Sequence, residues 1–111
     1  MDSLNTISLV GILERDLSTR FEREGIQVTT FTLRLEEHGK DGKAGQVFRV
    51  YVPVQAYGKT AEAAADLNVG DIVGVEGKLV WRSDWPGQTK GTLAVFARQV
   101  TCLLTAPVAV A

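Results

Sequence analysis

The triplet Gly58-Lys59-Thr60 is the first place in the chain where residue types and spacing could do chemistry. It matches the end of a phosphate-binding loop, which needs a further glycine five positions before the Gly-Lys pair and a parallel α/β setting. Here Pro53 occupies that earlier position, and proline has no N–H group to offer a phosphate. The flanking segments alternate like antiparallel strands. We therefore interpret the triplet as a corner between a strand and a helix, not as a nucleotide site.

Catalytic and metal-binding arrangements find equally little support. His38 is the only histidine and Cys102 the only cysteine, and they are far apart in the chain. We interpret His38 as a solvated loop residue and Cys102 as a small buried apolar one. Glu36, Glu37 and Asp41 form a solvated charge cluster in the same interpretation. The sequence thus predicts no enzyme activity, no cofactor, no bound metal and no small-molecule substrate.

Composition limits the class of protein. The 111 residues suffice for one domain, and 45% hydrophobic with 23% charged residues is typical of a globular fold. No apolar run has the length of a membrane span, and the N-terminus does not resemble an export signal. We therefore expect a cytoplasmic, nucleoid-associated protein or one inside an organelle, with no membrane partner. Because the net charge is only -1, nucleic-acid binding would need a local basic patch.

Apolar and polar residues alternate with the period of β-strands. Five segments show this pattern, and they span residues 5–13, 26–37, 46–57, 71–82 and 91–103. The alternation assigns Phe48 and Val50 of the third segment, and Leu79 and Trp81 of the fourth, to the core face. A short additional strand is expected around residues 20–21, and the alanine-rich segment 59–67 is the one expected helix.

The order of these elements predicts the fold. Three strands, a short helix and two strands make an all-β protein with a five-stranded antiparallel OB-fold barrel, whose helix lies between strands three and four. We assign residues 1–105 to this domain and residues 106–111 to a short apolar tail.

Basic and aromatic residues gather on the side of the strands opposite the core. Single-strand binders combine such cations, which contact phosphates, with aromatic rings on which bases stack. An antiparallel sheet can also use the same residues only to solvate its second face. From this pattern we select Arg34, Arg49, Tyr51, Tyr57, Lys59, Lys78 and Arg82, with Trp85 at the tip of a hairpin.

Four stretches resemble the bacterial single-stranded-DNA-binding proteins. They are "LNTISLVGILERD", "STRFEREG", "FTL" and "AYGKTAEAAADLNVGDIVGVEGKL", and the resemblance covers residues 4–103. It implies stacking roles for Tyr51, in the place of a tryptophan, and for Tyr57. It also implies that Lys59 contacts phosphate, that Arg20 faces the DNA, and that Trp85, one position out of register, substitutes for a hairpin tryptophan.

The chain also departs from the family pattern. The tryptophan that normally follows the second strand is missing near His38, and Val80 stands where a basic residue is usual. Pro53 replaces another basic residue, and we expect the strand to bulge there or to be an edge. The last residues, "LLTAPVAVA", do not resemble the family's acidic tip, so these 111 residues are not expected to recruit partners through one. Fewer rings and cations predict weaker binding.

The resemblance implies non-sequence-specific binding of single-stranded DNA in replication, recombination or repair, and single-stranded RNA would use the same surface. It also implies a homo-oligomer, dimer or tetramer, that pairs through the first strand, where residues 4–12 are apolar on both faces. The alternative is an OB-fold module for protein interaction or hetero-oligomerisation, with weak or no DNA binding.

Overall fold

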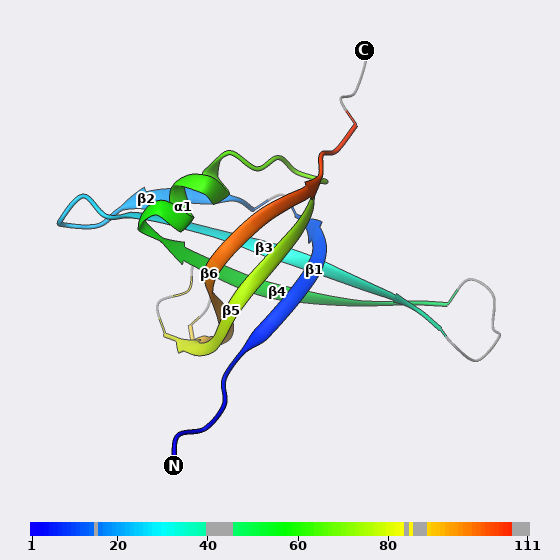
Figure 1. Ribbon diagram of the computed structural model, residues 1–111, viewed down its shortest axis with the longest axis horizontal. Coiled ribbons are helices and arrows are strands. Elements are labelled where there is room, and N and C mark those ends of the chain that lie inside the picture. Colours follow the sequence, from blue (N-terminus) through cyan, green and yellow to red (C-terminus); the bar gives the residue numbers. More distant parts are fainter. Residues whose placement is uncertain (15, 40–45, 84, 86–88, 108–111) are drawn as a thin grey trace.

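The described residues fold as one strongly curved six-stranded sheet with a single short helix (Figure 1). The computed structural model describes residues 1–14, 16–39, 46–83, 85 and 89–107. Its elements are β1 (Ile7–Leu13), β2 (Ser18–Phe21), β3 (Gln27–His38), β4 (Val47–Tyr57), α1 (Gly58–Ala65), β5 (Ile72–Arg82) and β6 (Thr92–Leu104). The predicted all-β class and the position of the helix are confirmed. The short strand expected around residues 20–21 is β2, so the sheet has six strands where five main ones were predicted.

The sheet closes on itself because β1 pairs at both of its edges. The strand order is β1-β5-β6-β4-β3-β2, and β1 also pairs with β3 at Ile12 and Leu13. Gly11 makes this crossing possible, since a Cβ atom there would lie 2.6 Å from the carbonyl oxygen of Arg34. Over residues 7–11, β1 pairs only with β5 among the described residues.

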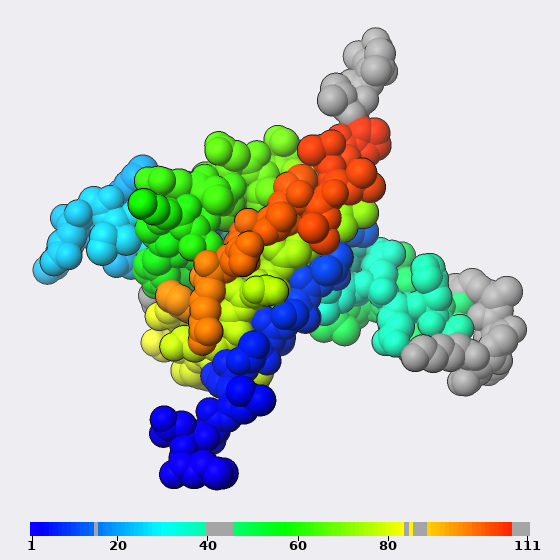
Figure 2. All heavy atoms as spheres, in the orientation of Figure 1, coloured from blue at the N-terminus to red at the C-terminus, as the bar shows by residue number. Residues whose placement is uncertain are grey.

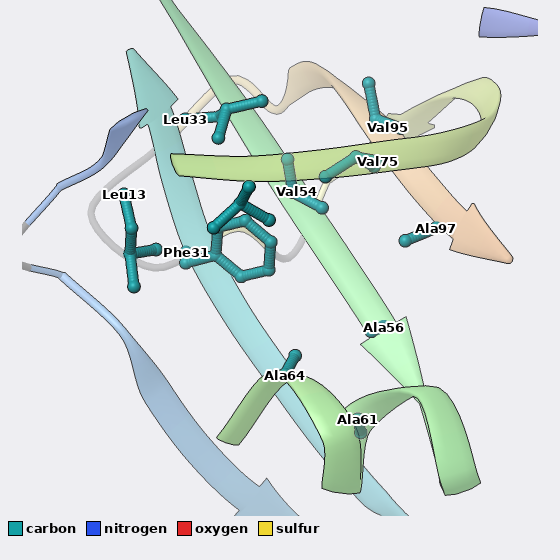
Figure 3. Packing of buried hydrophobic residues seen from close by; sticks show 11 residues of the cluster. Leu13, Phe31, Leu33, Val54, Ala56, Ala61, Ala64, Val75, Val95 and Ala97 are labelled. Carbon is teal, nitrogen blue, oxygen red and sulfur yellow. The ribbon is translucent and has the colours of Figure 1, made fainter. Parts of the chain in front are cut away.

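The barrel interior is filled by alternate residues of the strands. Phe31 and Leu33 of β3, Val54 of β4 and Val75 of β5 are all at most 1% exposed, and Figure 3 shows them facing one another. Helix α1 covers one end of this core with small side chains, Ala61 and Ala64, which let its backbone approach closely. A hydrogen bond of 2.9 Å from the Thr29 hydroxyl to the Ala61 carbonyl fastens the helix to β3.

Two strand pairs run on past the barrel, and the core assignment is wrong there. Phe48 and Val50 are 53% and 56% exposed, and Leu79 and Trp81 are 45% and 63% exposed. The β3–β4 arm projects from the body, as Figure 2 shows in teal and green. Alternation tells which side of the sheet a residue occupies, but not whether another strand lies opposite it. Cys102, expected to be buried, is also exposed, whereas His38 is exposed as predicted.

Pro53 causes no bulge, contrary to one of the two expectations for it. The β3–β4 pairing continues through Thr32 and Pro53 without a shift in register. Thr32 directs its N–H to Asp16 Oδ1 (2.9 Å) and its carbonyl to the N–H of Glu14 (3.0 Å), so both groups face away from β4. The pair is therefore of the non-hydrogen-bonded kind, and the Pro53 nitrogen faces away from β3 as well. On that side β4 pairs with β6 only at the next two positions, so Pro53 lies at an edge, as the other expectation had it.

Asp71 ties the end of the chain to the start of β5. Its side chain is buried and accepts hydrogen bonds from the backbone N–H groups of Ala106 (2.7 Å) and Asn68 (2.8 Å). These two bonds, that to Ala106 first, lower the pKa of the Asp71 carboxyl below its ordinary value.

Several predicted features fall partly outside the described residues. They are Asp41, most of the loop 37–45, the centre of the hairpin tip 83–91, and the tail beyond Pro107. The proposed division at residue 105 stays a prediction. Over the part of the chain that is described, no helix is long and apolar enough to cross a membrane.

Candidate nucleic-acid interface

Seven of the nine predicted site residues lie on one face of the sheet, which we call the outer face. Residues paired across neighbouring strands point to the same side of a sheet. The register pairs Arg34 with Tyr51, Gln55 with Phe96, and Phe96 with Lys78. The pairings of β2 with β3, of β3 with β4 and of β5 with β6 place further residues on the same face. The predicted residues on it are Arg20, Arg34, Arg49, Tyr51, Tyr57, Lys78 and Arg82.

An aromatic pair with two cations over it forms the centre of this face. The rings of Tyr57 and Phe96 stack with their centroids 5.5 Å apart and their planes at 25°. The Arg82 guanidinium lies 5.6 Å from the Tyr57 centroid and 6.0 Å from that of Phe96. Lys78 Nζ lies 5.7 Å from the Phe96 centroid. We call these four residues the aromatic platform.

Phe96 was missed by the sequence analysis, although the sequence contains a signal for it. Its neighbours Val95 and Ala97 are buried in the core, so alternation alone places Phe96 on the opposite side of β6. The predictions do not divide the last strand segment, residues 91–103, into its two faces, and for that reason they do not include Phe96.

The corner after β4 holds Tyr57 and Lys59 next to one another. Gly58 has a positive φ of 61°, a conformation that favours glycine, and it turns the chain from β4 into α1. Tyr57 is the last residue of β4 and stands at the N-cap of the helix, while Lys59 is exposed in the first turn. The Gly-Lys-Thr triplet is therefore the predicted corner, and it places the exposed Lys59 two residues after Tyr57.

Tyr51 occupies a different setting, at the root of the projecting arm. Its side chain is 56% exposed. The neighbouring cations are engaged by carboxylates: Arg34 Nη1 lies 2.7 Å from Glu14 Oε1 and Arg34 Nε lies 3.0 Å from Glu36 Oε1. Glu36 Oε1 also lies 3.3 Å from Arg49 Nε. We call these five residues the arm site.

The remaining predicted residues lie further out. Arg20 is exposed on β2 and forms a long ion pair of 3.8 Å with Glu22. Trp85 lies outside the strands and is half-buried, so it is less exposed than Trp81, which the sequence had assigned to the core. Val80, in the place of a basic residue, is on the outer face opposite the buried Ala94.

Comparison with known proteins identifies the family. The profile of the Single-strand binding protein family matches residues 4–103, which is nearly the whole chain. The chain belongs to this family. It is 33% identical over 82 residues to "Single-stranded DNA-binding protein 3" of Clostridium acetobutylicum, covering 72% of this chain and 56% of that protein. It is 32% identical over 81 residues to the protein of that name from Listeria innocua, covering 72% and 50%.

Solved structures of the family share the fold. The crystal structure of the single-stranded DNA-binding protein from Thermus aquaticus superposes with a TM-score of 0.74 at 26% identity, over 90% of this chain and 50% of that one. The predicted OB-fold is confirmed. PriB from Ralstonia solanacearum, at 15% identity and a TM-score of 0.69, shows the same fold over 91% of this chain and 99% of its own. The chain spans about half the length of the curated relatives it matches.

Proposed function

We propose that the protein binds single-stranded DNA on its outer face, without strong sequence preference and without a catalytic step. The observation that carries this proposal is the Tyr57–Phe96 stack with Arg82 and Lys78 over its rings. Rings that accept a base and cations that accept a phosphate are the two components of single-strand binding. Family membership supports the same conclusion, because the two curated relatives carry single-stranded DNA binding in their names.

The energetics favour an exchange at the platform when DNA arrives. A cation over an exposed ring gains about 0.5–1 kcal/mol, whereas a base stacked on the ring gains about 1–3 kcal/mol. Arg82 and Lys78 can therefore leave the rings to a base and move to the phosphates on either side of it. Lys59, two residues after Tyr57, and Arg20, on β2, extend the same path for the backbone.

The net charge of -1 is compatible with this path because the charges are unevenly distributed. Arg34 and Arg49 are ion-paired with Glu14 and Glu36 in the arm site, whereas Arg82 and Lys78 lie over aromatic rings. DNA should therefore engage the platform first and the arm site second.

A second copy of the chain is the proposed partner, and β1 is the proposed contact. The edge of β1 that faces away from β5 is unpaired over residues 7–11 among the described residues. Val10 of β1 and Val50 of β4 are 60% and 56% exposed and line one hollow on that side of β1. An unpaired edge beside apolar side chains supports strand addition by a like surface. A dimer or tetramer would place several outer faces along one strand of DNA.

The proposed ligand, single-stranded DNA, indicates the biological setting. Single-stranded DNA arises in replication, recombination and repair, so we place the protein with the nucleoid in the cytoplasm or inside an organelle. RNA offers the same bases and phosphates and would bind the same face.

Titration of labelled oligo-dT, followed by fluorescence anisotropy at low and moderate salt, tests the proposal. We expect binding whose logarithmic salt slope is about -0.7 for each phosphate neutralised. Anisotropy is preferable to tryptophan emission, because Trp81 lies on the inward side of β5 and Trp85 lies outside the strands. If the protein binds no oligonucleotide at low salt, the DNA proposal fails and the protein-interaction alternative replaces it.

A further inference from the structure

Strand β6 contains an extra residue just after Phe96, and that residue is Arg98. Ala97 of β6 pairs with Gly77 of β5. The neighbouring residue of β5, Glu76, pairs with Gln99, so Arg98 has no partner on β5. This is the arrangement of a β-bulge, in which one strand has a residue more than the other. Because bulges redirect side chains and are frequent next to functional sites, Arg98 is a candidate for a role in binding.

Gly77 allows β5 and β6 to approach closely at this bulge. A Cβ atom at Gly77 would collide with the carbonyl oxygen of Phe96 and would lie 3.0 Å from the Cα atom of Ala97. Any larger residue would therefore push β6 away from β5 just before Arg98. The glycine in β5 and the extra residue in β6 thus belong to one arrangement of the two strands.

The bulge is fastened to the first turn of α1. The Thr60 hydroxyl donates a hydrogen bond of 3.2 Å to the carbonyl oxygen of Arg98. The extra residue of a bulge is left out of the ladder, so a side-chain donor stabilises its backbone there. Because Lys59 directly precedes Thr60, this bond also holds two exposed cationic residues, Lys59 and Arg98, close together in the fold.

Arg98 lies on the outer face, beyond Phe96 in the direction away from Arg82. Ala97 packs in the core with the alanines of α1, whereas Arg98 is exposed, so Arg98 leaves β6 on the same side as Phe96. Arg82 pairs with Thr92, which precedes Phe96 on β6, and its guanidinium reaches to 6.0 Å from the Phe96 centroid. The rings of the platform therefore have one arginine before them and one after them along β6.

No carboxylate of the described residues engages the Arg98 guanidinium. Arg20, Arg34 and Arg49, by contrast, each form an ion pair with a glutamate. A guanidinium without such a partner has no ion pair to break when a phosphate approaches. Its planar fork of N–H groups also fits two phosphate oxygens at once.

We propose that Arg98 binds a backbone phosphate next to the base that stacks on the aromatic platform, on the side away from Arg82. This inference rests on the proposed function, since it assumes that a base stacks there. A base within a strand has a phosphate on each side, and Arg82 and Arg98 lie on either side of the rings. Lys59 adds positive charge at the Arg98 end. Because a phosphate carries no sequence information, the contact adds affinity without sequence preference.

Removal of the Arg98 charge tests the proposal through salt dependence. Arg98→Gln should weaken oligo-dT binding at low salt and reduce the logarithmic salt slope by about 0.7, the value for one phosphate contact. Arg98→Lys keeps the charge and should retain a slope close to that of the native protein. Arg23→Gln is the matched control, because Arg23 is exposed in the turn between β2 and β3, and it should leave the slope unchanged. Thermal melts verify that each variant is folded.

A second measurement needs only the native protein. Phenylglyoxal modifies accessible arginines, and mass spectrometry of the peptides gives the rate of modification at each one. Saturating oligo-dT should slow the modification of Arg98 several-fold, because the bound phosphate covers its guanidinium. The rate at Arg23 should stay the same.

An unchanged salt slope in Arg98→Gln, or equal modification of Arg98 with and without bound oligo-dT, would overturn the contact while leaving single-strand binding intact. Equal changes in Arg98→Gln and Arg23→Gln would also overturn it, because they would assign the effect to net charge. If no oligo-dT binds at low salt, the proposed function itself fails.

Discussion

The outer face has two halves that use the same residue types in opposite ways. In the aromatic platform, Arg82 and Lys78 lie over the rings of Tyr57 and Phe96. In the arm site, the exposed Tyr51 has two arginines beside it that are already bound to carboxylates. A cation over a ring is easily exchanged for a base, whereas a cation in an ion pair must first give up a partner of opposite charge. The count of basic residues on a face therefore overstates what it offers to a phosphate.

The two halves also differ in how they are supported. The platform is built where β4, β6 and β5 are neighbours in the sheet. The arm is a two-stranded extension of β3 and β4, and a two-stranded ribbon without a further strand is marginally stable. We expect the platform to be the preorganised half of the interface and the arm site to adjust to the DNA.

Replacing the two tyrosines in turn gives the largest expected difference between the halves. Tyr57→Ala should weaken oligo-dT binding about tenfold or more, because a stacked base contributes about 1–3 kcal/mol. Tyr51→Ala should weaken it by about threefold or less, below the low end of that range. Anisotropy titrations of both variants, with thermal melts to verify folding, give the comparison. A larger loss for Tyr51→Ala would reverse our ranking of the two halves.

Removing cations should separate the halves through salt dependence. Arg82→Gln should reduce the logarithmic salt slope by about 0.7, the value for one phosphate contact on single strands. Arg49→Gln, the matched change in the arm site, should reduce it by less, because Arg49 already neutralises Glu36. Slopes measured from low to moderate salt decide this. Equal reductions would show that the ion pair in the arm opens fully on binding.

Removing the Glu36 carboxylate should make the arginines of the arm site more available to phosphates, as Arg82 and Lys78 of the platform are. Glu36→Gln releases both Arg34 and Arg49 from one carboxylate, so we expect oligo-dT to bind a few-fold tighter at low salt. The melting temperature should change little, since exposed ion pairs contribute about 0–1 kcal/mol. Glu62→Gln, on the exposed side of α1, is the control for loss of a negative charge elsewhere. A similar gain from Glu62→Gln would assign the effect to net charge alone.

Asp71→Asn should lower the melting temperature of the protein. It should not change how strongly the aromatic platform or the arm site binds DNA. The folded-state pKa of Asp71 is lowered, so its carboxylate adds stability above its ordinary pKa of 3.8. That contribution disappears as the pH falls through the folded-state pKa. Native protein should therefore melt higher than Asp71→Asn at neutral pH, and the gap should narrow toward acid. A difference in melting temperature that stays constant with pH would contradict the stabilising role of the Asp71 carboxylate. Altered DNA binding by the folded Asp71→Asn variant would contradict a purely structural role.

Much of this interface was predictable from the sequence because strand alternation has a fixed period. The outward placement of Tyr51, Tyr57, Lys78 and Arg82 follows from it, and the register confirms that placement. Phe96 was within reach of the same reasoning, since it stands between the buried Val95 and Ala97.

Other features could not be predicted because they depend on the lengths of elements and on contacts across the sheet. Trp81 is exposed because the end of β5 extends beyond the barrel. The local sequence pattern does not indicate where the strands on the opposite side of the barrel end. The ion pair between Arg34 and Glu14 joins residues twenty positions apart, and Glu14 lies just after the end of β1.

Pro53 hinders the addition of strands from other molecules to the sheet. Among the described residues, no strand pairs with the edge of β4 along the arm, and open edges invite strands from other chains to add and seed aggregates. Because the Pro53 nitrogen faces that edge and carries no hydrogen, a strand added there would meet a gap in its line of donors. The residue that removes a cation from the family pattern thus protects the arm that carries Tyr51. We expect Pro53→Arg to add a positive charge to the outer face and to make the concentrated protein more prone to aggregate.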